Sequence, residues 1–427
     1  MGLDMTLRPL GSVARITSGG TPSRARPEFW GGEIPWVKTT QVQNGEVNAA
    51  DIDEFITPEG LRQLGSKLIP KDAILLAMVG QGKTRGQVAL LNFDAAINQN
   101  CAALIPTAAM DARFLFQQLL YRYKQLRLLS NSSGQNNLNA TLLRSFKVYA
   151  PPISFQILVS QVLSDWDAAI ETTSSVVAML ERRKQGLMQQ LLTGRRRLKG
   201  FKGKWKPIRL GSVLQRITRK NTTACLVPLT VSAQRGLVEQ SSYFAKQIAA
   251  TDNEHYLLLQ RGEFAYNRSA AIGYPFGAIK RLDAFDEGIV STLCLCFGIA
   301  DEEKTDSDFL VGLLDAGLLN RELRAIAHEG ARSHGLLNVT ATDFFNTRVS
   351  LPGIDEQRAM AEVLRDMNTE LTLRRRQLDE LKAQKRALMQ KLLSGEWCLP
   401  EPSAQRKSSS KKGLQSANTL RKQLSKK

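Results

Sequence analysis

Cysteine and histidine are scarce in this sequence of 427 residues, which holds five cysteines and three histidines. Five cysteines cannot form a disulfide framework in a chain this long. None of the histidines lies at ligand spacing from a cysteine pair, so we predict no zinc fold and no metal site. Cys294 and Cys296 lie in the apolar run "STLCLCFGI", which is typical of small buried residues in a strand. The remaining residues of these two types are Cys101, Cys225, Cys398, His255, His328 and His334.

Long apolar runs are also missing. No run reaches the roughly 18 residues that a membrane-spanning helix needs. The start of the chain, "MGLDMTLRPLGSV", lacks the charged first residues and the apolar block of a signal peptide. We therefore expect the protein in the cytoplasm.

Acidic residues are few relative to basic ones, with 40 Asp and Glu against 58 Lys and Arg. The resulting net charge of +18 predicts a polyanionic partner. Nucleic acid is the first candidate and an anionic membrane surface the second, while a basic protein with neither partner remains an alternative. The length and the 43% hydrophobic content allow two to four domains with proper cores.

The chain carries an internal repeat. The segment "RPLGSVARITSG" at 8–19 returns as "IRLGSVLQRITRK" at 208–220. The best match is "ERRKQGLMQQLLTG" at 181–194 against "KAQKRALMQKLLSG" at 382–395, which are 382 − 181 = 201 residues apart. A period this long is not that of a solenoid and indicates a duplicated unit, a globular part followed by a long helix.

Each repeat ends in about forty residues with apolar positions every three or four residues, which predicts a helix of roughly 60 Å. Gly194 and Gly395 follow, where helices often end. Such a stripe needs a partner helix, so we expect an antiparallel pair with the globular parts at its opposite ends. The alternative is two separate helices, each packed on its own domain. The stripe residues proposed for the helix-pair or subunit interface are Val162, Trp166, Leu180, Leu187, Leu191, Val363, Met367, Leu381, Leu388 and Leu392.

The globular parts are predicted to be mixed α/β. The strand candidates are 34–39, 73–78, 87–91, 263–267 and 292–297, and one helix is predicted in each half, at 111–129 and 307–327.

The stretch "AILLAMVGQGKTRG" at 73–86 matches a loose phosphate-binding P-loop. A P-loop needs a helix that begins at its Lys-Thr, whereas here "RGQVALLNF" resumes a strand pattern. We therefore interpret the stretch as a hairpin with a cationic tip, Lys83 to Arg85. Asn267 and Arg268 are similarly placed in the second half. Nucleotide binding through Ala77–Thr84 is kept as the weaker alternative.

Polar residues in Gly- or Asn-rich loops are the candidates for DNA contact, because their side chains can bond base edges or phosphates. They are Thr39, Thr40, Gln41, Gln43, Lys83, Thr84, Arg85, Gln135, Asn136, Asn137, Ser232, Gln234, Arg235, Asn267, Arg268, Arg332, Ser333 and His334. No catalytic constellation stands out in the sequence.

The ordered set of motifs resembles the specificity subunits of type I restriction–modification systems. It comprises the "LGSV" openings, "IPWVKTTQV", "INQN" (97–100), "GLLNVTATDF" (335–344), "LPGIDEQ" (351–357), "KQGLMQQLLTG" and "KRALMQKLLSG". The resemblance covers about residues 5–397. It implies an α/β (α+β) chain with two target-recognition domains, two long helices packed as an antiparallel coiled-coil-like pair, and an internal pseudo-twofold repeat.

The resemblance also implies a function. Each domain recognises one half of a split, asymmetric DNA site, and the helices set the unread spacer. The subunit itself is non-catalytic. It recruits two modification (methyltransferase) subunits and also restriction subunits, so S-adenosylmethionine, ATP and magnesium are expected on the partners and no cofactor on this chain. A stand-alone DNA-binding protein of the same fold is the alternative.

The predicted organisation has five parts. They are a first recognition domain at 1–150, a helix and basic linker at 151–206, a second recognition domain at 207–350, a helix at 351–397 and a basic tail at 398–427. The linker region "GRRRLKGFKGKWKPIRL" has eight Lys or Arg and no acid, which fits either phosphate contact or a solvated linker. The tail departs from the family pattern, and its composition predicts disorder with added non-specific DNA affinity as one possible role.

Overall fold

The fold is taken from a computed structural model. It describes residues 6–65, 68–80, 82–129, 137–222, 225, 227–243, 254–271, 273–329, 337–394 and 396–397. The predicted tail at 398–427 lies outside this described part. Within it, no helix is long and apolar enough to cross a bilayer.

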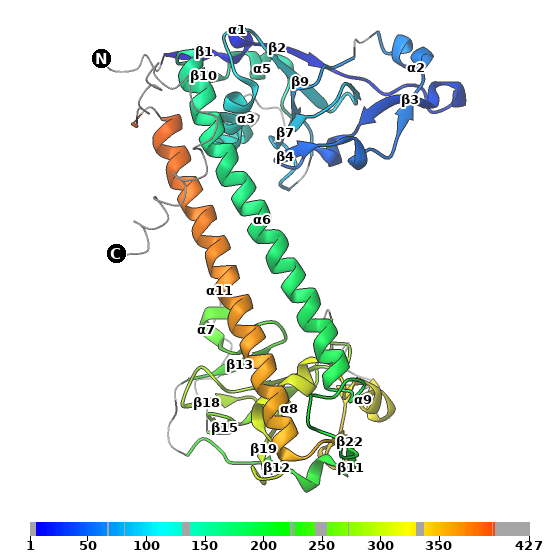
Figure 1. Cartoon of the computed structure of the whole chain (residues 1–427), viewed down its shortest axis with the longest axis vertical. Coiled ribbons are helices and arrows are strands. Elements are labelled where there is room, and N and C mark those ends of the chain that lie inside the picture. Colours follow the sequence, from blue (N-terminus) through cyan, green and yellow to red (C-terminus); the bar gives the residue numbers. More distant parts are fainter. Residues whose placement is uncertain are drawn as a thin grey trace. The chain divides into compact units, whose positions relative to one another are not determined.

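The chain forms two compact units (Figure 1), here called unit 1 (Met1–Thr172 with Leu378–Lys427) and unit 2 (Thr173–Gln377). The division passes through both long helices, α6 (Ile153–Leu191) and α11 (Ile354–Leu393). Each unit therefore contains a stretch of both helices together with its own sheets.

Unit 1 is organised by a five-stranded sheet in the order β2-β9-β6-β7-β4, antiparallel except for the parallel pair β4–β7. Both faces of this sheet are buried. Along β6, Ile74 and Leu76 enter one core, whereas Leu75 and Ala77 enter another, as the two-residue period of a strand requires. The strands are β2 (Ala14–Ser18), β4 (Gly45–Val47), β6 (Ile74–Ala77), β7 (Val88–Leu91) and β9 (Cys101–Pro106).

Smaller elements complete unit 1. A second sheet has the order β5-β3-β8, and β1 pairs with β10. These elements are β1 (Leu7–Pro9), α1 (Leu10–Val13), η1 (Pro27–Phe29), β3 (Trp30–Val37), η2 (Thr39–Gln41), η3 (Ala49–Asp51), β5 (Phe55–Ile56), α2 (Pro58–Gln63), β8 (Ala96–Ile97), α3 (Ala112–Tyr121), α4 (Tyr123–Leu129), α5 (Ala140–Ser145) and β10 (Lys147–Tyr149).

Unit 2 repeats this plan. Its main sheet has the order β12-β19-β16-β17, which corresponds to β2-β9-β6-β7, and β11 pairs with β22 as β1 does with β10. Further two-stranded sheets are β13–β14, β15–β18 and β20–β21. The elements are β11 (Lys206–Arg209), η4 (Leu210–Ser212), β12 (Leu214–Ile217), β13 (Leu229–Ser232), β14 (Gly236–Glu239), α7 (Gln240–Tyr243), β15 (Leu257–Gln260), β16 (Phe264–Asn267), β17 (Ala278–Arg281), β18 (Glu287–Val290), β19 (Leu295–Ile299), α8 (Ser307–Asp315), α9 (Asn320–Ile326), β20 (His328–Glu329), β21 (Leu337–Asn338), α10 (Ala341–Asn346) and β22 (Arg348–Leu351).

The mixed α/β prediction is confirmed, and the strand candidates lie on or beside β3, β6, β7, β16 and β19. Cys296 is buried in β19, as its apolar run predicted. The helices predicted at 111–129 and 307–327 are present, but each is divided in two, into α3 and α4 and into α8 and α9. The first is broken at Arg122, which leaves the helical conformation (φ −95°, ψ 18°), and the second at Gly317, whose φ of +67° a helix does not allow.

Local hydrogen bonds show how closely the repeats agree. Asp111 caps α3 by accepting from the Phe114 amide at 2.8 Å, and Asp306 caps α8 in the same way through Phe309. A buried glutamine in the first turn of each long helix holds that cap in place. Gln156 accepts the Asp111 amide at 2.8 Å, and Gln357 accepts the Asp306 amide at 3.0 Å. The duplication read from the sequence is therefore a duplication of structure.

The two long helices are confirmed, and they pack against each other within each unit. In unit 1, Lys385 of α11 pairs with Asp167 of α6 at 2.5 Å. In unit 2, Arg375 pairs with Glu181 at 2.5 Å. Later residues of α6 thus meet earlier residues of α11, which is an antiparallel arrangement.

The predicted interface stripe is buried to different degrees. Leu191 and Leu392 are 1% and 0% exposed and belong to the cores of units 2 and 1, so the end of each helix packs on the globular part of the other repeat. The other eight are half-buried: Val162, Trp166, Leu180, Leu187, Val363, Met367, Leu381 and Leu388.

Candidate nucleic-acid interface

The stretch that resembled a P-loop is a hairpin. β6 and β7 pair antiparallel with Leu76 opposite Val88, and turns at 82–83 and 85–86 lie between them. No helix begins at Lys83 and Thr84, so the phosphate-holding helix N-terminus of a P-loop is missing. The hairpin interpretation is confirmed.

A cationic pocket of 590 Å³ lies between this hairpin and helix α4 of unit 1. The Tyr123 hydroxyl donates to the carbonyl oxygen of Lys83 at 2.5 Å, and Arg127 donates to the Tyr123 hydroxyl at 2.9 Å. These bonds hold α4 against the hairpin tip. Four cations and no acid are present among the lining residues, which are Asn44, Lys83, Arg85, Gln87, Tyr123, Lys124, Arg127 and Leu128. A site with this charge is suited to phosphate oxygens.

The sequence candidates included the hairpin half of this pocket but missed the helical half. Tyr123, Lys124 and Arg127 were assigned to a helix without a binding role. The dense "YRYKQLR" at 121–127, rich in aromatic and basic residues, was the signal that could have drawn attention to them.

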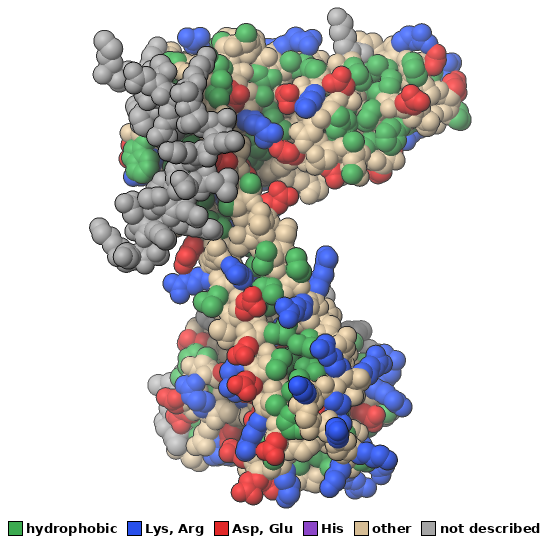
Figure 2. Space-filling model, viewed as in Figure 1, with side chains coloured by type: hydrophobic (Ala, Val, Ile, Leu, Met, Phe, Trp, Pro, Cys, Tyr) green, Lys and Arg blue, Asp and Glu red, His purple; other side chains and the backbone are tan. Residues whose placement is uncertain are grey.

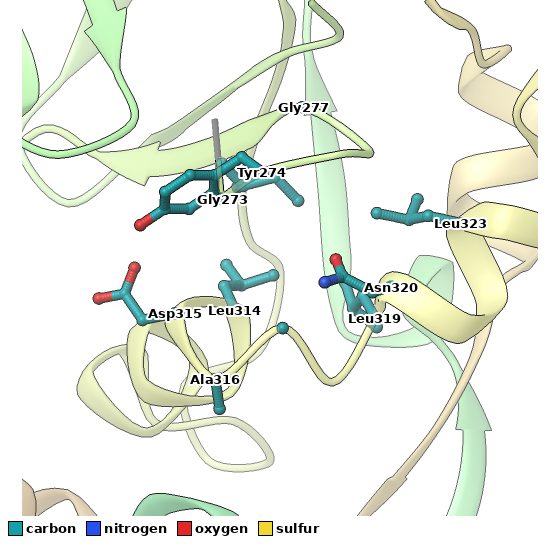
Figure 3. Close-up of a pocket in the computed structure, with 11 residues that line it drawn as sticks. Gly273, Tyr274, Gly277, Leu314, Asp315, Ala316, Leu319, Asn320 and Leu323 are labelled. Carbon is teal, nitrogen blue, oxygen red and sulfur yellow. The ribbon is translucent and has the colours of Figure 1, made fainter. Parts of the chain in front are cut away.

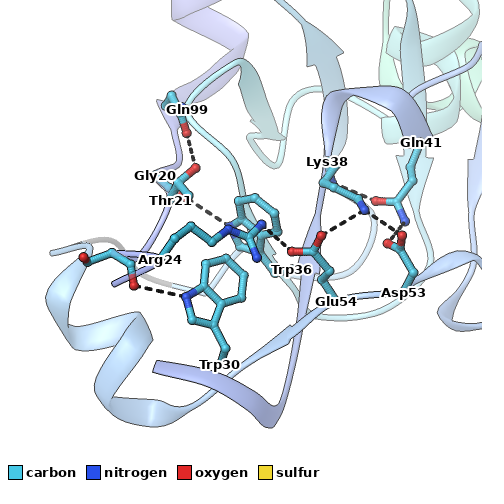
Figure 4. A network of polar contacts seen from close by, with 11 residues as sticks. Gly20, Thr21, Arg24, Trp30, Trp36, Lys38, Gln41, Asp53, Glu54 and Gln99 are labelled. Atoms are coloured by element: carbon cyan, nitrogen blue, oxygen red, sulfur yellow. Dashed lines mark hydrogen bonds and ion pairs between the residues drawn. The ribbon is translucent and has the colours of Figure 1, made fainter. Parts of the chain in front are cut away.

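The second group of candidates lies in the loop after β3, which a polar network holds (Figure 4). Lys38 pairs with Asp53 at 2.6 Å and with Glu54 at 3.2 Å, and the hydrogen bond from Lys38 holds the pKa of Asp53 below its ordinary value. Gln41 accepts the Lys38 amide at 2.7 Å and donates to the Asp51 carbonyl at 2.6 Å. The Gln41 side chain is therefore used inside the loop.

Of the three other candidates in this loop, two are exposed. Thr39 is half-buried, with its hydroxyl bonded to Asn98 at 3.1 Å. Thr40 and Gln43 are exposed, and the Gln43 amide donates to the Thr40 carbonyl at 2.7 Å. Thr40 and Gln43 are thus the polar side chains that this anchored loop presents to a ligand.

The remaining candidates of unit 1 and one group of unit 2 are only partly described. Asn137 is exposed and precedes the N-cap of α5, Asn139, by two residues. Gln135, Asn136, Arg332, Ser333 and His334 lie outside the described residues.

In unit 2 a tight turn joins β13 to β14 and carries three candidates. Gln234 and Arg235 are exposed at the turn. Ser232 is 5% exposed, and its hydroxyl accepts the Arg235 amide at 3.2 Å. Ser232 therefore shapes the turn, and Gln234 and Arg235 are the groups that face solvent.

The Arg268 side chain is bound within the protein. Its guanidinium donates to the Leu293 carbonyl at 2.8 Å and to the Val339 carbonyl at 3.0 Å, which ties the β16–β17 loop to two other segments. Asn267 beside it accepts the Ser269 amide at 3.0 Å. The guanidinium that the sequence offered for DNA contact is thus already bound to the protein's own backbone.

We expect Arg268→Gln to lower the stability of unit 2 by about 2 kcal/mol, because charge-assisted bonds to backbone carbonyls are lost. Thermal unfolding measures this, with Arg235→Gln in the exposed turn as the control that leaves the melting temperature unchanged. An unchanged melting temperature together with weaker DNA binding would show instead that Arg268 is released to the DNA.

Unit 2 has a pocket at the place equivalent to the cationic pocket, between its β16–β17 loop and the α8–α9 turn (Figure 3). Its volume is 220 Å³, and Asp315 is its single charged lining residue. Figure 3 shows the Tyr274 hydroxyl directed toward the Asp315 side chain. Lys280 pairs with Asp315 at 2.6 Å. Because this pocket lacks the four cations of its counterpart, the two units present different chemistry at equivalent places.

Basic side chains in unit 2 gather instead around the segment that joins α6 to β11. Figure 2 shows Lys and Arg side chains along the flank where α9, β11 and β22 are labelled in Figure 1. Arg197 anchors this segment through two bonds of 2.5 Å to Glu356, which is 3% exposed. The other seven basic residues are exposed: Arg195, Arg196, Lys199, Lys202, Lys204, Lys206 and Arg209. This region can therefore contact phosphates without disturbing the fold.

Comparison with known proteins places this fold among DNA-specificity proteins. Residues 3–182 match the family described as "Type I restriction modification DNA specificity domain". The MjaVIII type I restriction enzyme specificity subunit of Methanocaldococcus jannaschii is 24% identical over 307 residues, 67% of this chain and 70% of that protein. The putative MjaX specificity subunit of the same organism is 21% identical over 92% of this chain and 93% of its own length.

A solved structure agrees in fold. The type I restriction–modification system S subunit from M. genitalium has a TM-score of 0.56 and 14% identity, over 92% of this chain and 96% of that one. The first part of the chain thus carries a type I restriction–modification DNA specificity domain. Along nearly its whole length the chain is similar in sequence to a type I specificity subunit, and in fold to a solved S subunit.

Proposed function

We propose that units 1 and 2 each recognise one half of a split, asymmetric DNA sequence, with α6 and α11 setting the distance between the halves. The proposal rests on one observation: the two units share the same fold, but the surfaces that they offer to a ligand differ. The sheet order, caps and buried glutamines repeat, whereas the hairpin pockets differ in charge. Two half-sites on a duplex require a set separation between the parts that recognise them, which the helices would supply.

Phosphate contacts would supply much of the affinity. The net charge of +18, the cationic pocket of unit 1 and the seven exposed basic residues after α6 all favour this. Base contacts would come from the exposed loop groups, among them Thr40, Gln43, Gln234 and Arg235.

The chain would act as the non-catalytic recognition component of a larger complex in the cytoplasm. The partners would be two modification subunits, which methylate adenine with S-adenosylmethionine, and restriction subunits, which use ATP and magnesium. Half-buried apolar residues along the helix pair, such as Trp166 and Met367, offer surface that partner subunits could cover.

A genome-wide map of methylated adenine in the host, with and without this gene, tests the proposal. We expect one split, asymmetric methylated motif to disappear when the gene is removed. An unchanged map from a host in which the modification subunit is expressed and active would contradict the proposal. The alternative, a stand-alone DNA-binding protein of this fold, predicts that the chain is purified from its host without a methyltransferase.

A further inference from the structure

The structural repeat allows residues of the two helix pairs to be compared position by position. Gln156 and Gln357 occupy equivalent places, and 357 − 156 = 201. The same offset relates Lys184 to Lys385 and Asp167 to Asn368. The caps Asp111 and Asp306 differ by 195, which relates Gln117 of α3 to Gly312 of α8.

In unit 1 three of these positions form a closed polar cluster. The Lys385 ammonium, on a side chain 10% exposed, donates to the Asp167 carboxylate at 2.5 Å and to the Gln117 side-chain oxygen at 3.2 Å. The Gln117 amide donates to the other oxygen of Asp167 at 2.8 Å. The buried ammonium is thus neutralised by a carboxylate of the chain itself.

In unit 2 the lysine is kept, but its two partners are replaced. Asn368 stands where the carboxylate would be, and Gly312 removes the glutamine side chain. A pocket of 480 Å³ occupies this place, lined by Lys184, Asn368 and Gly312 together with neighbouring side chains. Burial lowers the pKa of the Lys184 ammonium below its ordinary value. The charge of Asp315, which lines the same pocket, offsets this effect of burial only in part.

The acids around this pocket are already paired with other cations. Asp308 binds Arg281 at 2.7 Å and also Arg365. Asp283 binds Arg281 at 2.7 Å, and Asp315 binds Lys280 at 2.6 Å. The lining holds three cations, Lys184, Arg281 and Arg365, and three acids, but Asp315 is paired with Lys280 from outside the lining. Among the described residues Lys184 therefore has no ion-pair partner within bonding distance, and the carboxylate that Asp167 supplies to Lys385 has no counterpart here.

We propose that this pocket of unit 2 binds a carboxylate from outside the chain, which pairs with Lys184 as Asp167 pairs with Lys385. An aspartate or glutamate side chain of a modification subunit has the required charge. Met188, Val311 and Leu364 supply apolar walls for its methylene groups. The pocket opens at the surface beside Arg365, whose side chain is 63% exposed, so a docking protein can reach it. The identity of the partner rests on the proposed function, whereas the carboxylate site does not.

Two variants test the site from opposite directions. Lys184→Met removes the cation, and Asn368→Asp supplies the missing carboxylate within the chain. Arg183→Gln is the matched control, because it loses one charge at an exposed position next to Lys184. We expect Asn368→Asp to raise the melting temperature of the isolated chain by about 2 °C, as a new partly buried ion pair forms. No rise, or a fall, would overturn the assignment of a missing carboxylate.

Titration with the modification subunit identifies the source of the carboxylate. We expect both Lys184→Met and Asn368→Asp to weaken assembly about tenfold or more, while Arg183→Gln binds as the natural chain does. Wild-type assembly by both variants would overturn the partner assignment.

Acetate, added to the isolated chain at constant ionic strength, is the second arm. If it raises the melting temperature of the natural chain but not of Lys184→Met, and assembly is unaffected by either variant, the site binds a free carboxylic acid and the partner assignment is wrong. The acetate measurement itself requires neither DNA nor a partner. Failure of the site is therefore distinguishable from failure of the proposed function, which the methylation map tests.

Discussion

Replacing Lys83 and Lys124 together by glutamine is expected to weaken DNA binding by roughly 60-fold at 0.1 M salt. Both lysines line the cationic pocket of unit 1. Each lost phosphate contact removes about 0.9 from the slope of log affinity against log salt concentration. Two lost contacts therefore reduce that slope by about 1.8, and titrations of DNA at several salt concentrations measure it.

Controls separate this effect from general loss of charge. Lys71 and Lys147 of unit 1 are exposed and do not line the pocket, so the matched double change to glutamine should alter the slope much less. Assembly with modification subunits should be intact in both double variants. Neutralising Arg85 should act in the same direction, but Arg85 is half-buried, so the lysine pair is the cleaner test. Equal slopes for the two pairs would contradict a phosphate site in this pocket.

Leu392→Asp should destabilise unit 1 by about 4 kcal/mol or more. Leu392 is fully buried in the core that α11 shares with α3 and α6. A carboxylate there would be buried without a partner, which is among the most costly single changes. Because small domains are stable by only about 5–15 kcal/mol, much of unit 1 should unfold at moderate temperature. Denaturant titration followed by circular dichroism measures the loss.

The same substitution at Leu373 of α11 is the matched control, because that side chain is 61% exposed. Leu373→Asp should change stability by less than about 0.5 kcal/mol. The double change Leu187→Asp with Leu388→Asp should lie between these extremes, because both side chains are half-buried, and it should still disrupt assembly with partner subunits. Normal assembly of that double variant would contradict the paired-helix interface.

Periodic features of the sequence were predicted well. The long helices and the repeat follow from apolar spacing and from motif copies, which are local or self-similar signals. The hairpin at 73–91 was predicted because a glycine, Gly86, and then a second strand-like pattern follow Lys83-Thr84. The breaks at Arg122 and Gly317 were missed, because an apolar pattern continues through them and only the conformation of those residues ends the helix.

The sequence by itself determined that this chain is a basic, duplicated α/β protein with two long helices, and the motif set indicated its family. Net charge, apolar periodicity and internal repeats are properties of the sequence itself, so they can be recognised without the folded structure. Tertiary structure alone decided which polar groups are available to a ligand. Arg268 and Gln41 are bound to the backbone, whereas Lys124 joins Lys83 from a helix 41 residues away in sequence (124 − 83 = 41). Tertiary structure also decided that, within the described part of the chain, Lys385 forms an ion pair with a carboxylate and Lys184 does not. Such pairings depend on which distant residues packing brings within about 3 Å, and a sequence pattern does not specify that distance.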